Sequence, residues 1–267
     1  MQWNMQNNIN ILCIGDIVGR PGRAVLAQAL DGLRRAHSID CVIVNAENAA
    51  GGSGIQPRQA EEIFALGVDA ITLGDHVWDK PDIQAYLDSH PCIVRPANFP
   101  DGTPGRGWAV VDCAKGIKVG VINLLGRTFM RYNVQCPFRT LDAAVQAIQA
   151  QTPVIAVDMH AETTSEKVAM GHYSDGRVSV VFGTHTHIQT ADEKILPQGS
   201  AYITDLGMSG PYDSVIGQNK EKIIRRFLTS MPQKFEVAEG AGVLHGVVVA
   251  VDAKTGRAHS ITRIQQH

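Results

Sequence analysis

Two histidines separated by one threonine follow an apolar run in the second half of the chain. The run 178–185 reads VSVVFGTH, so His185 closes a strand-like segment and His187 comes two residues later. Each imidazole has a polar N–H and a lone pair that need partners, which makes two neighbouring histidines awkward inside a core. Neutral imidazole is a common metal ligand. The motif therefore indicates a metal site, provided that other ligands meet it.

The ends of four further strand-like runs carry residues of types that bind metals. These residues are Asp16, Glu47 and Asn48, Asp75 and His76, and His160. Taken alone, Asp16 could cap a helix, Asn48 could belong to a turn, and His160 could be a hydrogen-bonded core histidine. If the strands are neighbours, however, three carboxylates and three imidazoles meet at one edge. Without cations the carboxylates would repel one another there.

Two divalent ions would relieve that repulsion. Oxygen and imidazole donors without a thiolate suit iron, manganese, zinc or cobalt. The number of ligands fits two ions if one carboxylate bridges them, and Glu47 is the candidate bridge. Asp79 follows His76 closely, and we interpret it instead as the N-cap of a helix expected over 80–88.

The rest of the chain supplies the elements that position these residues. Strands are expected at 8–15, 41–45, 69–74, 121–126, 153–160 and 178–185, and helices at 21–35, 57–67, 80–88 and 141–148. A capping-box pattern from Thr163 to Glu166 predicts the start of another helix. Apolar strands that alternate with helices indicate an α/β fold. The hairpin-like segment 108–122 and a strand-rich C-terminal third add antiparallel strands, so we expect two mixed sheets packed together with helices outside.

Composition narrows the class of protein. A chain of 267 residues with 44% hydrophobic residues can build a large core, and its net charge of −2 argues against an extended nucleic-acid or membrane surface. The N-terminal stretch MQWNMQNNIN lacks the apolar region of a secretory signal, and no apolar run approaches the roughly 20 residues that span a bilayer. The five cysteines form no CxxC pair, and we expect them to be reduced thiols of a cytoplasmic protein: Cys13, Cys41, Cys92, Cys113 and Cys136.

The chain resembles the calcineurin-like metallophosphoesterase superfamily over nearly its whole length, and most closely its bacterial cyclic-nucleotide phosphodiesterase branch. The similar segments include IGDIVGRPGR (14–23), VNAENAAGGSGI (44–55), DMHAETTSEK (158–167), GTHTHIQTAD (183–192) and YITDLGMSGPYD (202–213). The resemblance implies a single domain over 1–267, a four-layer α/β/β/α sandwich, a dinuclear metal centre and phosphodiester hydrolysis. In that branch the metals are held by the residues that match Asp16, Glu47, Asn48, His160, His185 and His187, and the residue that matches His76 is the proton donor.

One position departs from the pattern of that branch. The third motif usually reads Gly-Asn-His, whereas this chain has Gly74, Asp75 and His76. Aspartate can ligate a metal as asparagine does, so Asp75 stays among the expected ligands. Its extra negative charge predicts weaker phosphate binding than in relatives, or a preference for a more highly charged iron pair.

The resemblance implies a pair of metal ions, with iron favoured and manganese or zinc as alternatives, and 2′,3′- or 3′,5′-cyclic mononucleotides as substrates. We expect a bridging hydroxide to attack phosphorus while His76 protonates the leaving oxygen. The glycine-rich loop 49–54 could contact a phosphate or be a plain connection, and segment 209–213 could shape the pocket. Arg95 and Arg127 are expected more as solvated surface residues than as phosphate ligands.

Three other functions were weighed. The glycines at 15, 19 and 22 do not match the G-x-G-x-x-G dinucleotide motif, and no Asp-His pair follows His187 as in metallo-β-lactamase-type enzymes. The remaining alternative is a weakly active regulatory protein that binds metal or nucleotide and acts through a partner. Retention of His76 argues for the enzyme, because a sensor needs no general acid. A homo-oligomer is left open.

Overall fold

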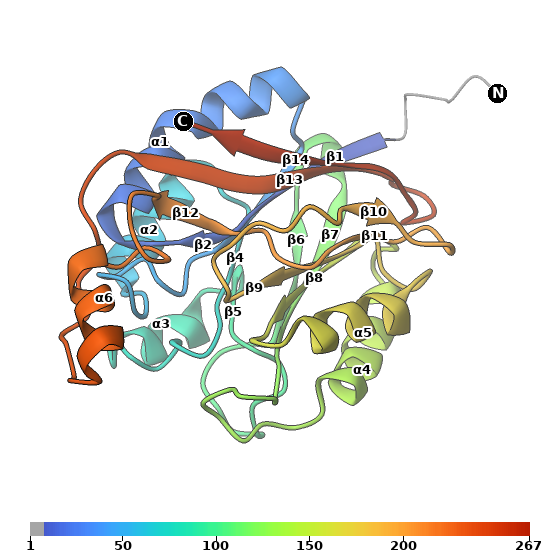
Figure 1. The fold of residues 1–267 in the computed structure, drawn as a ribbon. Coiled ribbons are helices and arrows are strands. Elements are labelled where there is room, and N and C mark those ends of the chain that lie inside the picture. The colour runs from blue at the N-terminus through green and yellow to red at the C-terminus, as the bar shows by residue number, and fades with distance from the viewer. Residues whose placement is uncertain (1–7) are drawn as a thin grey trace.

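The computed structural model describes residues 8–267. Residues 1–7, with most of the N-terminal stretch that the sequence analysis judged not to be a signal, lie outside the described part. Among the helices that are described, none is both long enough and apolar enough to cross a membrane. Figure 1 shows two β-sheets lying against each other with helices on their outer faces.

The first sheet has eight strands and positions those candidate ligands that come from the N-terminal part of the chain. Its strand order is β2-β12-β13-β1-β3-β4-β5, and β14 pairs with β13. Strands β1, β3, β4 and β5 run parallel, whereas β13 is antiparallel to β1, so the sheet is mixed. The strands are β1 (Asn8–Ile14), β2 (Asp16–Ile17), β3 (Cys41–Asn45), β4 (Ala70–Thr72), β5 (Ile93–Val94), β12 (Met208–Pro211), β13 (Gly242–Asp252) and β14 (Ala258–Gln266).

The second sheet has six strands in the order β10-β11-β9-β8-β7-β6 and positions the candidate histidine ligands. Its inner strands are parallel, and its edge strands β6 and β10 are antiparallel to their neighbours. The strands are β6 (Trp108–Asp112), β7 (Lys118–Leu125), β8 (Ile155–His160), β9 (Val180–Thr184), β10 (Lys194–Ile195) and β11 (Ala201–Ile203). The antiparallel hairpin expected over 108–122 is the pair β6–β7.

Three cores separate the four layers. Leu30 of α1 (Gly19–His37) and residues of α2 (Pro57–Ala65) and α3 (Ile83–Ser89) pack on one face of the first sheet. Ile43 and Phe182 belong to the core between the sheets. Leu141 of α4 (Pro137–Gln149) and Met170 of α5 (Thr164–Ser174) cover the second sheet, where Figure 1 shows both helices. This arrangement confirms the expected α/β/β/α sandwich of two mixed sheets.

Part of the C-terminal third differs from the expectation. Helix α6 (Lys220–Thr229) was not predicted, although Ile223, Ile224, Phe227 and Leu228 have the spacing of one apolar helix face. In the structure only Ile223 of this face is buried, whereas Phe227 and Leu228 are exposed. Strand β12 was also missed, since four residues of the sequence MSGP give no clear alternation. Both elements lie close to the segments that border the candidate metal centre.

Candidate metal centre

The strand ends that carry the predicted ligands meet at one edge of the two sheets. Asp16 opens β2, Glu47 and Asn48 follow β3, and Asp75 follows β4. His160 is the last residue of β8 and pairs in register with Thr184, so His185 emerges beside it. The carboxyl ends of adjacent parallel strands share one edge of a sheet, and here the edges of both sheets face the same space.

Four side chains form the tightest group. One donor atom from each of Glu47, Asp75, His160 and His185 lies within 4.8 Å of the donor atoms of the others. Nε2 of His160 is 3.2 Å from Oε1 of Glu47 and 3.2 Å from Oδ1 of Asp75. Nδ1 of His185 is 3.4 Å from the same Asp75 oxygen. These donors suit a divalent transition-metal ion.

A second group of donors lies next to the first. Nε2 of His187 is 3.9 Å from Oδ1 of Asp16, and Oδ2 of Asp16 accepts a hydrogen bond from the backbone N–H of His185. Oδ1 of Asp16 and Oδ1 of Asn48 are buried and accept no hydrogen bond from the described residues. Buried oxygens without a donor are costly. A cation between them would remove that cost, so this group also fits a metal ion.

Gly74 is required by the closeness of the two sheets at this point. A Cβ atom there would overlap Oε2 of Glu47 and Nε2 of His160. Any larger residue would push the carboxylate and the imidazole apart. The glycine thus lets three strand ends approach one ion position.

Hydrogen bonds outside the donor group fix which nitrogen of His160 and of His187 faces the donors. Nδ1 of His187 donates to the carbonyl of Ile216 over 2.9 Å, and Nδ1 of His160 donates to Oγ1 of Thr184 over 2.8 Å. Thr184 donates in turn to Asp158 over 2.6 Å. Such outer contacts select the tautomer that leaves Nε2 free to bind a metal. Asp158 is fully buried, and burial raises its pKa to about 6.

An ion pair inside the protein supports the loop that bears His185 and His187. Both histidines have a positive φ, 95° and 65°, which is strained for residues with a side chain. Asp205 accepts hydrogen bonds from the hydroxyl of Thr186 and from Nζ of Lys167, each over 2.7 Å. Asp205 and Lys167 are fully buried. This pair holds the strained loop between its two histidines.

The electrostatics of the group call for positive charge. Burial by itself would raise the pKa of Asp75, but hydrogen bonds to His160 and His185 outweigh it and lower that pKa far below its usual range. Burial opposes a charge on His160, yet Glu47 and Asp75 raise its pKa well above the ordinary value. The carboxylates therefore favour a protonated imidazole when no other cation compensates them. Divalent ions would supply the same compensation.

His76 lies beside this group with its own orienting carboxylate. Nδ1 of His76 is 2.7 Å from Oδ2 of Asp79, and the backbone N–H of His76 donates to Oε2 of Glu47 over 3.0 Å. Ser53 also donates to Asp79, and Arg131 forms an ion pair with it at 2.7 Å. Burial opposes the charged form of His76, but Glu47, Asp75 and Asp79 raise its pKa.

The interpretation of Asp79 as a helix cap was wrong. Helix α3 begins at Ile83, and its N-cap residue is Asp82. The carboxylate of Asp79 instead faces His76, because the turn 75–79 folds back toward the glycine-rich loop. The pattern from Thr163 to Glu166 did predict the start of a helix, because Thr163 is the N-cap of α5. Its bonds differ from those of a capping box: Oγ1 of Thr163 donates to Oε2 of Glu166 over 3.0 Å, and Glu166 accepts the backbone N–H groups of Arg127 and Thr128.

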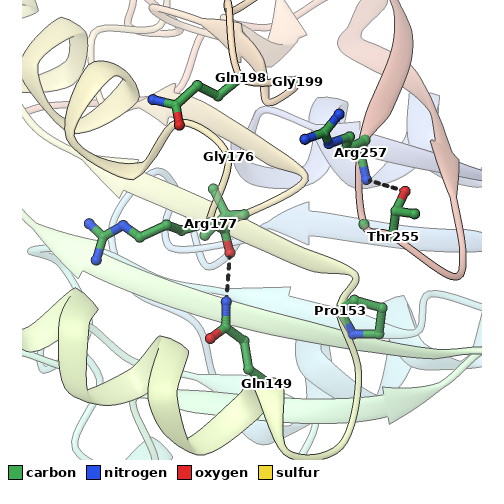
Figure 2. Close-up of a pocket in the computed structure, with 10 residues that line it drawn as sticks. Gln149, Pro153, Gly176, Arg177, Gln198, Gly199, Thr255 and Arg257 are labelled. Atoms are coloured by element: carbon green, nitrogen blue, oxygen red, sulfur yellow. Dashed lines mark hydrogen bonds between the residues drawn. The ribbon is translucent and has the colours of Figure 1, made fainter.

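A cavity of about 570 Å³ opens over these groups. Its walls include Glu47, Asn48, Gly51, Gly52, Ser53, His76, Asp79, Glu162, His185, Thr186, His187, Ile216, Gln218 and Phe235. The loop 49–54 is therefore part of the wall, whereas segment 209–213 contributes no lining residue. Figure 2 shows a different pocket of about 250 Å³, lined by residues such as Gln149, Arg177 and Arg257; none of its lining residues is Asp, Glu, His or Cys. It therefore offers no carboxylate or imidazole ligand.

The two arginines have different roles. Arg95 is buried, and its guanidinium donates to the carbonyls of Pro96, Thr103 and Pro104. Arg95 is therefore neither a solvated surface residue nor a phosphate ligand, because its guanidinium holds a loop through these hydrogen bonds. Arg127 is exposed, as expected for a surface residue.

Several supporting residues were not identified from the sequence: Ser53, Arg131, Asp158, Glu162, Thr184, Lys167 and Asp205. Asp158 had a usable signal, because it stands two residues before His160 on a strand and so faces the same side. Oε2 of Glu162 lies 3.1 Å from Nε2 of His185. Lys167 gave no signal, since a lysine on a helix is usually exposed.

Comparisons with known proteins identify similar chains. A family model described as YmdB-like protein matches residues 12–264. The chain is 48% identical over 256 residues to a Bacillus subtilis (strain 168) protein named 2′,3′-cyclic-nucleotide 2′-phosphodiesterase, covering 96% of each chain. It is 39% identical over 258 residues to a putative phosphatase/phosphodiesterase of Mycoplasma pneumoniae, covering 94% of this chain and 90% of that one.

Solved structures share the fold. A hypothetical protein from Thermus thermophilus superposes with a TM-score of 0.89 at 38% identity, covering 96% of this chain and 98% of the other. A novel phosphatase of Mycoplasma pneumoniae gives a TM-score of 0.91 at 37% identity, covering 98% of this chain and 94% of the other.

Proposed function

This chain belongs to the YmdB-like protein family, and we propose that it is a metal-dependent phosphoric diester hydrolase that acts on 2′,3′-cyclic mononucleotides. One observation carries the proposal: the donor group of Glu47, Asp75, His160 and His185 lies beside a histidine that an acidic residue orients. The name of the Bacillus subtilis relative supports the 2′,3′-cyclic substrate and gives no support to the 3′,5′-cyclic alternative.

Two ions fit the donors described above. Asp75, His160 and His185 would hold one ion, Asp16, Asn48 and His187 the other, and Glu47 would bridge them. When bound, such ions supply a nucleophile from water at neutral pH and neutralise the phosphoryl oxygens. The ion identity, with iron favoured over manganese or zinc, the homo-oligomeric state and the cytoplasmic location stay predictions.

His76 provides the proton that the reaction needs. Hydrolysis of the cyclic diester adds water and breaks the bond from phosphorus to one ribose oxygen, which leaves as an alkoxide. Nδ1 of His76 is engaged by Asp79, so Nε2 is the atom that delivers the proton to that oxygen. Asp79 keeps the ring charged and oriented.

The test is hydrolysis by the purified protein after loading with Mn²⁺ or Fe²⁺. We expect turnover of 2′,3′-cyclic AMP, little turnover of 3′,5′-cyclic AMP or of p-nitrophenyl phosphate, and loss of both metal and activity in His187→Ala. Hydrolysis of the monoester alone would overturn the proposal. Tight nucleotide binding without turnover would favour the regulatory alternative.

A further inference from the structure

We infer that Phe235, Gln218 and Ile216 form a subsite for the nucleobase of the substrate, an inference that rests on the proposed function. All three line the cavity that contains His76, His185 and His187. At about 570 Å³ the cavity has the size of a small-molecule site and is large enough for a mononucleotide. The phosphate-facing donors occupy only one part of its wall.

Phe235 supplies an aromatic face at the mouth of the cavity. Its side chain is 57% exposed, although an aromatic ring gains free energy when it is covered. The guanidinium of Arg226 lies over the ring, 5.0 Å from its centroid, and holds the ring in place. A base stacked on the opposite face would cover part of the exposed ring, and such stacking depends little on which base is present.

Gln218 supplies a polar group with no partner. Its Oε1 atom is buried and accepts no hydrogen bond from the described part of the chain. A buried acceptor without a donor is costly, and a turn of the side-chain amide toward the cavity would let an N–H group of a base edge satisfy it. Gly52 lies close to this side chain, since a Cβ atom there would be 3.4 Å from Nε2 of Gln218, an ordinary contact distance.

Ile216 connects this subsite to the donors. Its side chain is 46% exposed in the cavity wall, and its carbonyl accepts the hydrogen bond from Nδ1 of His187. A base packed on Ile216 and Phe235 would therefore lie close to His187, the proposed metal ligand that donates to the Ile216 carbonyl.

The experiment compares 2′,3′-cyclic AMP with a diester of the same ring that lacks a base, methyl β-ribofuranoside 2,3-cyclic phosphate. In Phe235→Ala, kcat/KM for the nucleotide should fall about tenfold relative to kcat/KM for the base-free diester, mainly through KM. Gln218→Leu should also lower kcat/KM for the nucleotide relative to kcat/KM for the base-free diester, but by a smaller factor. Phe235→Trp should keep the wild-type ratio of the two values. Phe227→Ala is the matched control, because Phe227 is exposed on α6 but does not line the cavity.

Equal losses on both diesters in Phe235→Ala would overturn the base subsite while leaving the proposed function intact. If the wild type hydrolysed neither diester, the proposed function would fail, and calorimetric titration with 2′,3′-cyclic AMP would decide the subsite separately. Weaker binding in Phe235→Ala than in the wild type would then support it, and equal binding would overturn it. Unfolding midpoints of all variants show whether each one is folded.

Discussion

Oδ2 of Asp79 lies 2.7 Å from Nδ1 of His76, and this contact orients a histidine that lies beside the donor group. Arg131 binds the other oxygen of Asp79, so the carboxylate is held from both sides. The arrangement resembles the pairing of a catalytic imidazole with a carboxylate that fixes its tautomer.

Replacement of His76 tests its role as general acid. His76→Gln should lower kcat/KM for 2′,3′-cyclic AMP by roughly 10²–10⁴. The loss should be much smaller for bis(p-nitrophenyl) phosphate, because p-nitrophenolate leaves without a proton. Metal content measured by mass spectrometry should match that of the wild type. A variant that has lost its metal would show that His76 is a ligand.

Asp79→Asn tests the orienting carboxylate. We expect a loss of about 10- to 100-fold in kcat/KM for the cyclic nucleotide, since the amide no longer stabilises the charged imidazole. The matched control is Asp82→Asn, because Asp82 is exposed and precedes α3 without a side-chain capping bond. Equal activity of Asp79→Asn and Asp82→Asn would contradict an orienting role.

Asp75→Asn tests the effect of charge at the donor group. The change removes one negative charge 3.2 Å from Nε2 of His160. We expect phosphate to bind more tightly to the variant, because a site with higher positive charge attracts the anion more strongly. The measurement is the inhibition constant of phosphate in both proteins at equal metal content. The same constant in both would rule out the charge effect.

Lys167→Met tests the support of the loop 185–187. The substitution leaves Asp205 buried without its cation, and breaking a buried pair in this way costs about 3–5 kcal/mol in the free energy of unfolding. Urea unfolding measures this cost. The double variant Lys167→Met, Asp205→Asn should recover part of it, because it removes the unpaired charge and its amide oxygen can still accept the backbone N–H of Gly207. A cost below about 1 kcal/mol would contradict the assignment.

His245→Leu tests a titration outside the donor group. Burial, with a small contribution from His267, lowers the pKa of His245 to about 4, and Nδ1 of His245 faces the hydroxyl of Tyr212. The unfolded chain therefore binds a proton at this residue between about pH 6.5 and pH 4, while the folded chain does not.

Acid should thus destabilise the wild type more than the variant. Below pH 6.5 the free energy of unfolding of the wild type should fall relative to His245→Leu by about 1 kcal/mol for each pH unit, until about pH 4. Chemical unfolding at pH 7, 6, 5 and 4 measures the difference. A constant difference would show that His245 is protonated in the folded protein as well.

The positions of the proposed ligands were predictable because they depend on a local rule. Each stands where an apolar run ends, and parallel strands bring their ends to one edge, so Asp16, Glu47 and His160 could be grouped without knowledge of the loops. The same alternation of strands and helices gave the layers of the fold.

The supporting residues were not predictable because their partners are remote in sequence. Asp79 has the spacing of a helix cap, and only the closeness of Ser53 and Arg131 shows its other role. Lys167 pairs with Asp205, 38 residues away, at a position where lysine is normally solvated. Helix α6 is different: Ile223, Ile224, Phe227 and Leu228 have the spacing of an amphipathic helix, so the sequence carried a signal for α6 that the prediction overlooked.

The cavity wall contains two sets of residues that differ in how freely their sequence can change. The donors sit at the ends of strands anchored in both sheets, whereas Ile216, Gln218 and Phe235 come from one stretch of chain around α6. Exchange of residues 215–236 between relatives should therefore change which nucleotide is preferred and leave the donors at the strand ends unchanged. Sequence changes that alter the preferred nucleotide would then be concentrated in this one segment of the chain.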